Sequence, residues 1–429
     1  MTRVRLAIAA GAFAATLTLA ACGGGGSGAA SSGSSSQSNT TPPAAVTGPM
    51  RANTYTSGNQ EAPAVARNAA GSSVVAWDSV GQNGNLVGIF AQRFDASGSP
   101  QGGEFQVNTN TTSIHFAPAV AMAGDGSFVV LWHSNDQGGI GIDINGQRFA
   151  ADGTPQGGEF QINASPVYPG IGLAMDSAGD FVVAWGERTL TLTATTTSHL
   201  YVRRYAADGT ARAAPQRIAS SRNLILRIPK TAMDGNGNFA VAWNADNGGD
   251  PNSLKMTTGL GIFCQAFSAG GLPRTTAPQM VDTAQSGIFS DRPAIAMDPA
   301  GDFVVAWQAQ QQNLTPAGVF ARRYSSNGLA AGAAFQVGAT SDLQRTPAAA
   351  MDSSGNFTIA AQGDGIYAQS YTAQGNATSA DFRVDTAASH NTTLVPALAS
   401  DSSGNFAVAW QNLDGSGDRN VYTRLYKHP

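Results

Sequence analysis

The chain has 429 residues, of which only 12% are charged, and its formal net charge is −4 at pH 7. It contains no run of lysine or arginine, which argues against a nucleic-acid partner, because such a surface neutralises phosphates with a basic stripe. Its two cysteines, Cys22 and Cys264, are too few for a cysteine metal cage, and acylation of Cys22 would also exclude an internal disulfide.

The first residues predict an export signal. Arg3 and Arg5 form a positive start, residues 6–19 are apolar but too short to span a membrane, and small residues precede Cys22. Residues 19–22, Leu-Ala-Ala-Cys, resemble the lipobox of bacterial lipoproteins. The resemblance implies that residues 1–21 are removed and that Cys22 carries lipid, so that a membrane is a partner. The alternative is an ordinary secretory signal with a chance cysteine.

The segment after Cys22 predicts a tether. Residues 23–49 are almost wholly Gly, Ser, Ala, Thr and Pro, with little apolar surface to bury. We therefore expect a flexible linker over 22–48 and a folded domain over 49–429. In the lipoprotein family, an Asp after the lipidated Cys commonly retains the protein at the inner membrane. Gly23 stands there, so the resemblance implies an exported protein anchored to the cell envelope at the outer membrane.

A repeat fills the rest of the chain. The run Phe128-Val-Val-Leu-Trp132 recurs seven times at spacings of 49 to 64 residues, and it holds all six tryptophans of the protein. The copies centre on Trp77, Trp132, Trp185, Trp243, Trp307, Ala361 and Trp410. Periods near 50 residues with several strands each are typical of propeller blades. The sequence thus predicts an all-β fold, a seven-bladed β-propeller with a tryptophan position in the core between blades.

Each repeat predicts four antiparallel strands, here called a to d from the start of the repeat. Strand b is apolar at every position, as expected of a strand buried on both faces. The predicted repeats lie near 62–108, 117–163, 169–219, 229–282, 292–338, 346–385 and 395–428. The seventh repeat has no strand d, but Met50 to Thr54 aligns with Phe105 to Thr109. We therefore expect residues 49–54 to supply that strand and to close the ring.

The turn between strands a and b is Asp-x-x-Gly in five repeats. An Asp that caps its own turn, followed by a Gly free to adopt positive φ, is ordinary hairpin chemistry. Calcium is the functional alternative, but the oxygen ligands are too sparse for a calcium loop, so we expect no cofactor and no metal. The five histidines show no metal-ligand spacing, and Cys264 aligns with alanines in strand c, which predicts a small buried residue.

Comparison of the repeats with each other points to one face for function. The loops from b to c and from d to a differ in every copy, as expected of binding loops on a rigid scaffold. A polar residue follows the tryptophan position in six copies, which predicts a polar ring on that face: Asp78, His133, Asn244, Gln308, Gln362 and Gln411. Arg227, Arg292 and Arg345 precede strand a in three consecutive repeats and predict an anion site; the alternative is pairing with nearby carboxylates.

The string from Gly88 to Thr109 (Gly-Ile-Phe-Ala-Gln-Arg-Phe and onward), followed by the Phe-Val-Val-Leu-Trp type of strand, resembles a repeat of large secreted bacterial proteins. Those are often RTX-type or cadherin-containing surface proteins, and the resemblance implies exposure outside the cytoplasm and an adhesion or scaffold role. The leading hypothesis is therefore a binding module for a glycan or protein partner, with no catalytic residues. One alternative is a propeller hydrolase or lyase acting on an acidic polysaccharide, for which Asp78, Glu61 and His133 are the nearest candidates. Another is a purely structural envelope protein.

Overall fold

The computed structural model describes residues 41–428, except 85, 136–141, 166, 168–169, 191–195, 223, 247–260, 283–287, 312–315, 339–344, 387–394 and 416. Every regular element in these residues is a β-strand, which confirms the all-β prediction. No helix in this part of the chain is long and apolar enough to cross a membrane. The predicted signal segment and Cys22 lie outside the described residues.

Twenty-nine strands form seven antiparallel sheets, one per predicted repeat. Blade 1 comprises β3 (Gln60–Arg67), β4 (Ser73–Val80), β5 (Val87–Phe94) and β6 (Pro100–Gln106), and blade 2 comprises β7 (Ile114–Met122), β8 (Phe128–Asn135), β9 (Asp143–Phe149) and β10 (Phe160–Gln161). Blade 3 comprises β11 (Gly172–Met175), β12 (Phe181–Leu190), β13 (Thr196–Tyr205) and β14 (Gln216–Ser221), and blade 4 comprises β15 (Ile225–Met233), β16 (Phe239–Asp246), β17 (Gly261–Phe267) and β18 (Gln279–Met280).

The remaining blades continue the same order. Blade 5 comprises β19 (Ile288–Met297), β20 (Phe303–Gln311), β21 (Pro316–Tyr324) and β22 (Phe335–Val337), and blade 6 comprises β23 (Arg345–Met351), β24 (Phe357–Gln362), β25 (Ile366–Tyr371) and β26 (Phe382–Arg383). Blade 7 comprises β27 (Ala397–Ser400), β28 (Phe406–Leu413) and β29 (Arg419–Lys427), together with β1 (Ala44–Ala45) and β2 (Met50–Arg51).

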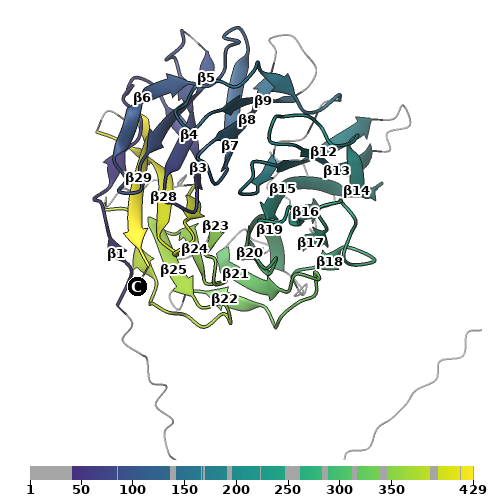
Figure 1. Ribbon diagram of the computed structural model, residues 1–429. Helices are drawn as coiled ribbons and strands as arrows, with labels where there is room; N and C mark the ends of the chain where they lie inside the picture. Colours follow the sequence, from purple (N-terminus) through teal and green to yellow (C-terminus); the bar gives the residue numbers. More distant parts are fainter. Residues whose placement is uncertain are drawn as a thin grey trace, which may run out of the picture. The chain divides into compact units, whose positions relative to one another are not determined.

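The first strand of each blade is innermost. These seven strands contact one another in ring order, from β3 through β7, β11, β15, β19, β23 and β27 back to β3. Figure 1 shows the outer strands β6, β14, β18 and β22 at the rim and the first strands around the centre. Residues just inside the start of each repeat therefore meet around one axis, although they lie 50 to 60 residues apart in the chain.

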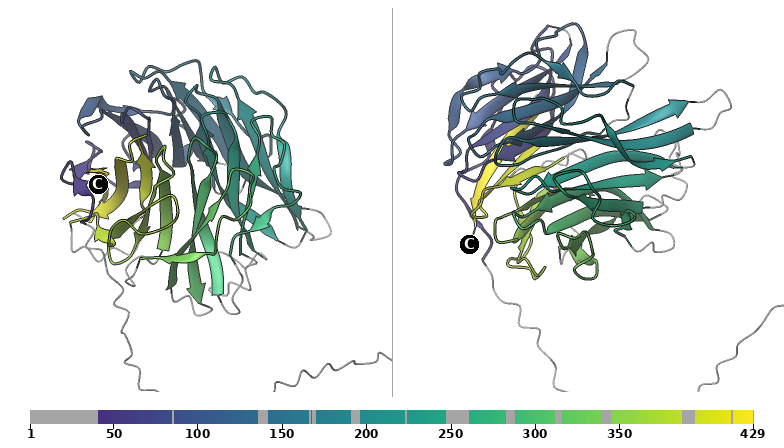
Figure 2. Two further views of the ribbon diagram at one scale, coloured as in Figure 1. Left: turned by 60° about the horizontal axis from the view of Figure 1, so that its bottom comes forward. Right: turned by 45° about the vertical axis from the view of Figure 1, so that its right-hand side comes forward.

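The N-terminal segment closes the ring as predicted. Met50 and Arg51 of β2 pair with Thr423 and Tyr422 of β29, in the register that Phe105 and Gln106 show on strand c of blade 1. Asn53 secures the join, because its Oδ1 accepts a hydrogen bond from the backbone N–H of Val421 at 2.8 Å. Figure 2 shows β1 running beside the C-terminal strand in both views.

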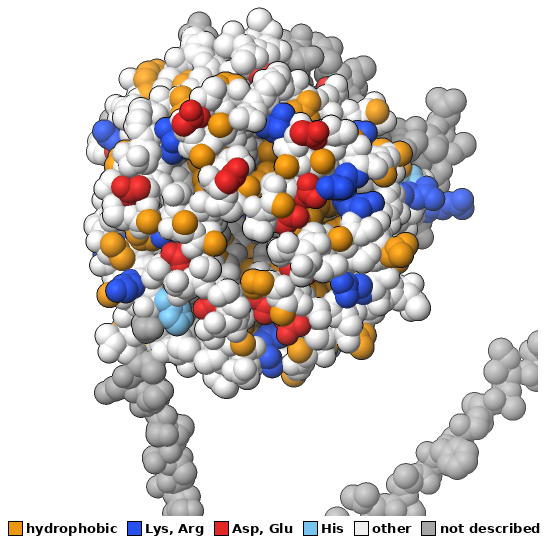
Figure 3. Space-filling model, in the orientation of Figure 1, with side chains coloured by type: hydrophobic (Ala, Val, Ile, Leu, Met, Phe, Trp, Pro, Cys, Tyr) orange, Lys and Arg blue, Asp and Glu red, His pale blue; other side chains and the backbone are white. Residues whose placement is uncertain are grey.

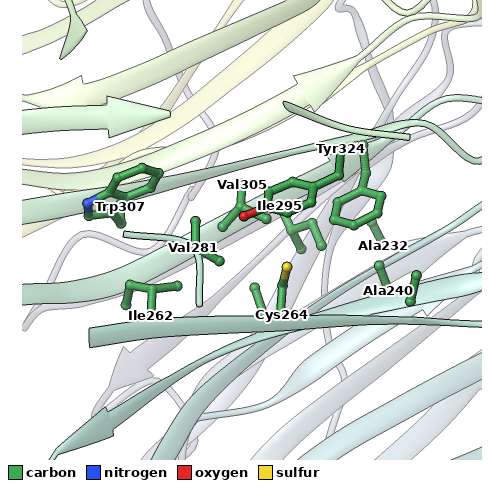
Figure 4. Packing of buried hydrophobic residues seen from close by; sticks show 12 residues of the cluster. Ala232, Ala240, Ile262, Cys264, Val281, Ile295, Val305, Trp307 and Tyr324 are labelled. Atoms are coloured by element: carbon green, nitrogen blue, oxygen red, sulfur yellow. The ribbon is translucent and has the colours of Figure 1, made fainter. Parts of the chain in front are cut away.

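The core lies between neighbouring blades. Tryptophans of strand b are at most 3% exposed, and those of blades 3, 4, 5 and 7 stack on an aromatic ring of strand c. Figure 4 shows one such layer, a cluster that contains Trp307 and Tyr324 of blade 5 together with Ile262 and Cys264 of blade 4. Cys264 is fully buried, as its alignment with alanines predicted, and burial raises the pKa of its thiol to about 12.

The turns between the first two strands are almost identical. In the five Asp turns, Oδ1 accepts backbone hydrogen bonds from the residues two and four positions later, at 2.8 to 3.0 Å. The following glycines have φ between 79° and 92°. Gly355 has two reasons to lack a side chain. Its φ of 80° disfavours other residues, and a Cβ there would lie 3.0 Å from Asp298 Oδ2 of the preceding blade.

Candidate functional site at the mouth of the central channel

The innermost strands surround a central channel with a volume of about 330 Å³. Its wall is made mostly of Pro, Ala, Val, Ile and Leu side chains. Among the described residues that line it, only Lys230 and Arg292 carry a charge, and both are cations. A concave space lined mostly by apolar side chains, with a few polar groups, is the usual form of a ligand site.

A bulge marks the loop end of each well-described innermost strand. In five blades the register shifts just before the proline of the strand, and the residue preceding the proline has φ between 46° and 52°. Proline disfavours the right-handed helical conformation in the residue before it. Positive φ in residues other than glycine is uncommon and stores strain, so another contact must hold it. Ile228 and Arg292 are the bulkiest residues in this conformation.

The predicted polar ring holds these bulges. The backbone N–H of Ala62 donates to Gln411 Oε1, that of Ala117 to Asp78 Oδ1, that of Gly170 to His133 Nε2 and that of Thr346 to Gln308 Oε1, at 2.8 to 3.2 Å. Each of these contacts joins one blade to the next. Asn244 donates instead to Ser290 O and Asp291 Oδ1, and Gln362 accepts from Thr346 Oγ1 at 3.5 Å. All of the ring except Asp78, which is half-buried, is buried.

The three arginines of the predicted anion site do not share one position. Arg227 forms an ion pair with Asp246 at the loop end of β16. Arg345 is exposed at the first residue of β23 and does not line the channel. Arg292 lines the channel with a side chain that is 53% exposed, and its Nε lies 4.0 Å from Asp291 Oδ2. The structure therefore brings one of the three into the channel.

Lys230 joins Arg292 there. It belongs to β15, directly after the bulge proline of blade 4, and its side chain is open to the channel. Among the described residues, none forms an ion pair or hydrogen bond with its ammonium group. Lys230 is exposed to the solvent in the channel. The surrounding strands still remove part of the hydration of its ammonium group, which lowers the pKa of Lys230, and the positive charge of Arg292 lowers it further.

A carboxyl pair lies at the same end of the innermost strands. Asp78 is directly opposite Glu61 in the pairing of β3 with β4, and Asp78 bonds to Ala117, the neighbour of channel-lining Pro118. Burial raises the pKa of Asp78 well above its usual range, and the charge of Glu61 raises it further. Glu61 forms an ion pair with Arg419. The two carboxyls therefore differ: one is favoured in its protonated form, and the other has a cationic partner.

His133 lies one blade further on. Its ring stacks on Phe116 with centroids 5.3 Å apart, and burial, together with the charge of Lys230, lowers its pKa to about 4. The imidazole is therefore neutral near pH 7. Because its Nε2 already accepts the N–H of Gly170, that nitrogen holds the backbone rather than a ligand.

The turn end of the innermost strands carries acidic side chains. The turn end carries the turn aspartates, and Figure 3 shows one face of the molecule on which acidic side chains lie around the middle and most basic ones lie further out. Of the turn aspartates, Asp401 forms an ion pair with the buried Arg67. No described group of three or more His, Cys, Asp or Glu residues is arranged to hold a metal ion.

Sequence reasoning missed Lys230, although a signal was present. The position after the strand-a proline, or after Ile171 in blade 3, is Ala or Gly in the six other repeats: Ala64, Ala119, Gly172, Ala294, Ala348 and Ala397. The chain has only three lysines, at 230, 255 and 427. A lone lysine that breaks a small-residue pattern on the innermost strand is therefore a visible exception.

The sequence matches no known family model and no curated protein. Its fold does match solved structures. One is a protein of unknown function from Dyadobacter fermentans DSM 18053, with a TM-score of 0.52 and 12% identity, covering 89% of this chain and 98% of that one. Another is the polysaccharide lyase Uly1, with a TM-score of 0.51 and 12% identity over 87% and 91% of the two chains. The GH93 α-L-arabinofuranosidase of Fusarium graminearum has a TM-score of 0.50 and 11% identity over 75% and 96%.

These neighbours correct the order of the functional hypotheses. The sequence favoured a binding or scaffold lipoprotein over an enzyme, and that order was wrong. The neighbours whose activity is named are a polysaccharide lyase and a glycoside hydrolase, which favours the enzyme alternative, although at 11% to 12% identity the likeness itself shows only the fold. No comparison shows a likeness to lipoproteins or to RTX and cadherin-type proteins.

Proposed function

We propose that this protein is a lyase that cleaves an acidic polysaccharide at the loop end of its central channel. The observation that carries the proposal is the pair Lys230 and Arg292 in a channel whose described lining holds no other charge. Lys230 has no carboxylate partner among the described residues, and the contact of Arg292 with Asp291 is long at 4.0 Å, so both cations can bind an anion. The carboxylate of a uronic acid residue is such an anion.

The sign of the charge favours elimination over hydrolysis. Glycoside hydrolysis passes through a transition state with positive charge on the sugar ring and uses two carboxyl groups on either side of the bond. Two cations in the channel would oppose that charge. In β-elimination a proton leaves the carbon next to the carboxylate, and negative charge develops on the carboxylate, where cations stabilise it.

Two side chains have a part in this reaction. Arg292 holds the sugar carboxylate, and the amine of Lys230, whose lowered pKa favours its free form, takes the proton from the adjacent carbon. The carbon–oxygen bond breaks as the double bond forms, and the departing oxygen takes a proton from water. The new ammonium group on Lys230 stabilises the negative charge that it has helped to create.

Substrate chemistry provides the first test. The full chain is incubated with a uronic acid polysaccharide and with the same polymer after chemical reduction of its carboxyls, and unsaturated product is followed by ultraviolet absorbance beside reducing ends. We expect unsaturated product from the acidic polymer alone. Equal cleavage of the reduced polymer, reducing ends without unsaturation, or no cleavage of any uronic acid polymer would each overturn the proposal.

Variants provide the second test. Lys230→Arg keeps the charge but removes the weak base, so kcat should fall about 10²- to 10⁴-fold. Arg292→Gln should raise KM for the acidic polymer more than it lowers kcat. Lys427→Arg is the matched control, because Lys427 is exposed at the end of β29, and it should change neither constant. Full activity of the Lys230→Arg variant would remove the lysine from the mechanism.

We further propose export and lipid attachment at Cys22, with the protein held at the outer membrane. The support is the lipobox resemblance of residues 19–22 and the resemblance of Gly88 to Thr109 to repeats of secreted RTX and cadherin-type proteins. A Cys22→Ala variant should leave the membrane fraction and lose labelling by a radioactive fatty acid. Membrane retention of that variant would point to another anchor.

A further inference from the structure

The amine of Lys230 has the environment of a nucleophile. It lies in a channel walled by apolar side chains, on the strand that faces the axis, and the nearby Arg292 is the only other charged group in the described lining. The surrounding strands and this neighbouring charge both favour the uncharged amine, and the exposed side chain is open to a ligand. A lysine next to another cationic group is a recognised form of activated amine.

The surroundings also define the ligand. The channel volume of about 330 Å³ admits small molecules, and Arg292 supplies the planar fork that binds carboxylates and phosphates. Half of the Arg292 side chain is exposed, and its contact with Asp291 is long at 4.0 Å, so the guanidinium retains donors for a ligand. A molecule that satisfies both groups carries an anion a short distance from an electrophilic carbon.

We propose that Lys230 captures small anionic aldehydes and ketones, such as 2-oxo acids, as imines, while Arg292 binds their anionic group. This inference uses the same two residues as the proposed elimination but needs no polysaccharide. It therefore assigns the channel a second class of ligand.

The step balances without a further reactant. The Lys230 Nζ lone pair adds to the carbonyl carbon, and one amine proton passes to the oxygen to give a carbinolamine. The second amine proton then leaves with that hydroxyl as water while the carbon–nitrogen double bond forms. The products are one imine and one water, and no atom is oxidised or reduced.

Reductive trapping tests the proposal. The full chain is incubated with glyoxylate and cyanoborohydride, which reduces imines to stable amines, and the modified lysines are read by peptide mass spectrometry. Only three lysines need to be followed, and exposed Lys427 is the internal reference. Glycolaldehyde, an aldehyde of similar size without the carboxylate, is the matched probe.

We expect glyoxylate to modify Lys230 faster than Lys427, since a lowered pKa raises the share of free amine and Arg292 holds the carboxylate of the probe beside it. The excess should shrink with glycolaldehyde and in the Arg292→Gln variant, which keeps Lys230 itself. Equal rates at Lys230 and Lys427, or equal preference for the two aldehydes, would overturn the proposal. Trapping does not depend on polysaccharide cleavage, so the failure of one activity leaves the other measurable.

Discussion

The two ends of the innermost strands follow different rules. At the turn end, five aspartates make the same pair of backbone hydrogen bonds in five blades. At the loop end, the residues before the bulge proline vary between blades, and Lys230 breaks a run of Ala and Gly. Groups that recur in most blades hold the ring together, whereas a group present in one blade is free to act on a ligand.

The largest effect should follow from breaking the turn end. Asp401→Ala removes two turn hydrogen bonds and leaves the buried Arg67, whose side chain is 2% exposed, without its ion-pair partner at 3.1 Å. Removing one partner of a buried ion pair destabilises by about 3–5 kcal/mol. Denaturant unfolding measures this loss.

The matched control is Asp234→Ala, a turn with the same hydrogen bonds but no ion pair among the described residues. Loss of a capping side chain alone lowers stability by roughly 1–2 kcal/mol. Equal losses in the two variants would show that the Arg67 contact adds nothing.

The next effect concerns acid stability at the loop end. The pKa of His133 is lowered to about 4 from its ordinary value near 6.5, so protonation favours the unfolded chain. The stability that neutral His133 contributes is present above pH 6.5 and is lost as the pH falls toward 4. A shift of this size corresponds to about 3 kcal/mol.

His133→Gln tests this dependence without losing the bulge contact, since Gln308 and Gln411 accept the same backbone hydrogen bond in other blades. The difference in unfolding free energy between pH 7 and pH 4 should be smaller in the variant. If the unfolding free energies of the variant and the parent fell equally between pH 7 and pH 4, the acid sensitivity would come from groups other than His133.

Asp78→Asn should act in the opposite pH direction. Its raised pKa means that the folded chain holds the proton more tightly than the unfolded chain does. The resulting stability is complete below the ordinary carboxyl pKa and is lost as the pH rises through the raised value. Asn mimics the protonated form and still accepts the N–H of Ala117, so the variant should be more stable than the parent at high pH. Lower stability of the variant at every pH would indicate that the charged form is the one the fold favours.

Lys230→Ala should have the smallest effect on stability. It restores the residue found at this position in five other blades, so the unfolding free energy should change by no more than about 0.5 kcal/mol. Elimination and imine trapping at this site should disappear in the same variant. A decrease of several kcal/mol in the unfolding free energy would show that Lys230 stabilises the fold. The proposed difference between the two ends of the innermost strands would then be wrong.

The sequence by itself determined the architecture. One tryptophan position repeated seven times defines blade number, because a buried strand tolerates few alternatives at its most crowded point. The missing last strand and its match at Met50 to Thr54 defined the closure and its register, since strand pairing follows the local apolar pattern. Both features depend on local sequence, and both can be recognised because the seven repeats can be compared with one another.

Only the tertiary structure decided the site. Lys230 and Arg292 come from blades 4 and 5, and both line the channel because the ring brings the first strands of separate repeats to one axis. Asp78 and His133 lie on the second strands of blades 1 and 2. The sequence predicted a ligand surface from the polar residues after the tryptophans, but Gln308 and Gln411 accept hydrogen bonds from the bulges of neighbouring blades. Arg227, predicted to bind an anion, forms an ion pair with Asp246. The burial of a side chain and the pKa of its ionisable group depend on neighbours from other blades. The local sequence around a residue does not identify those neighbours.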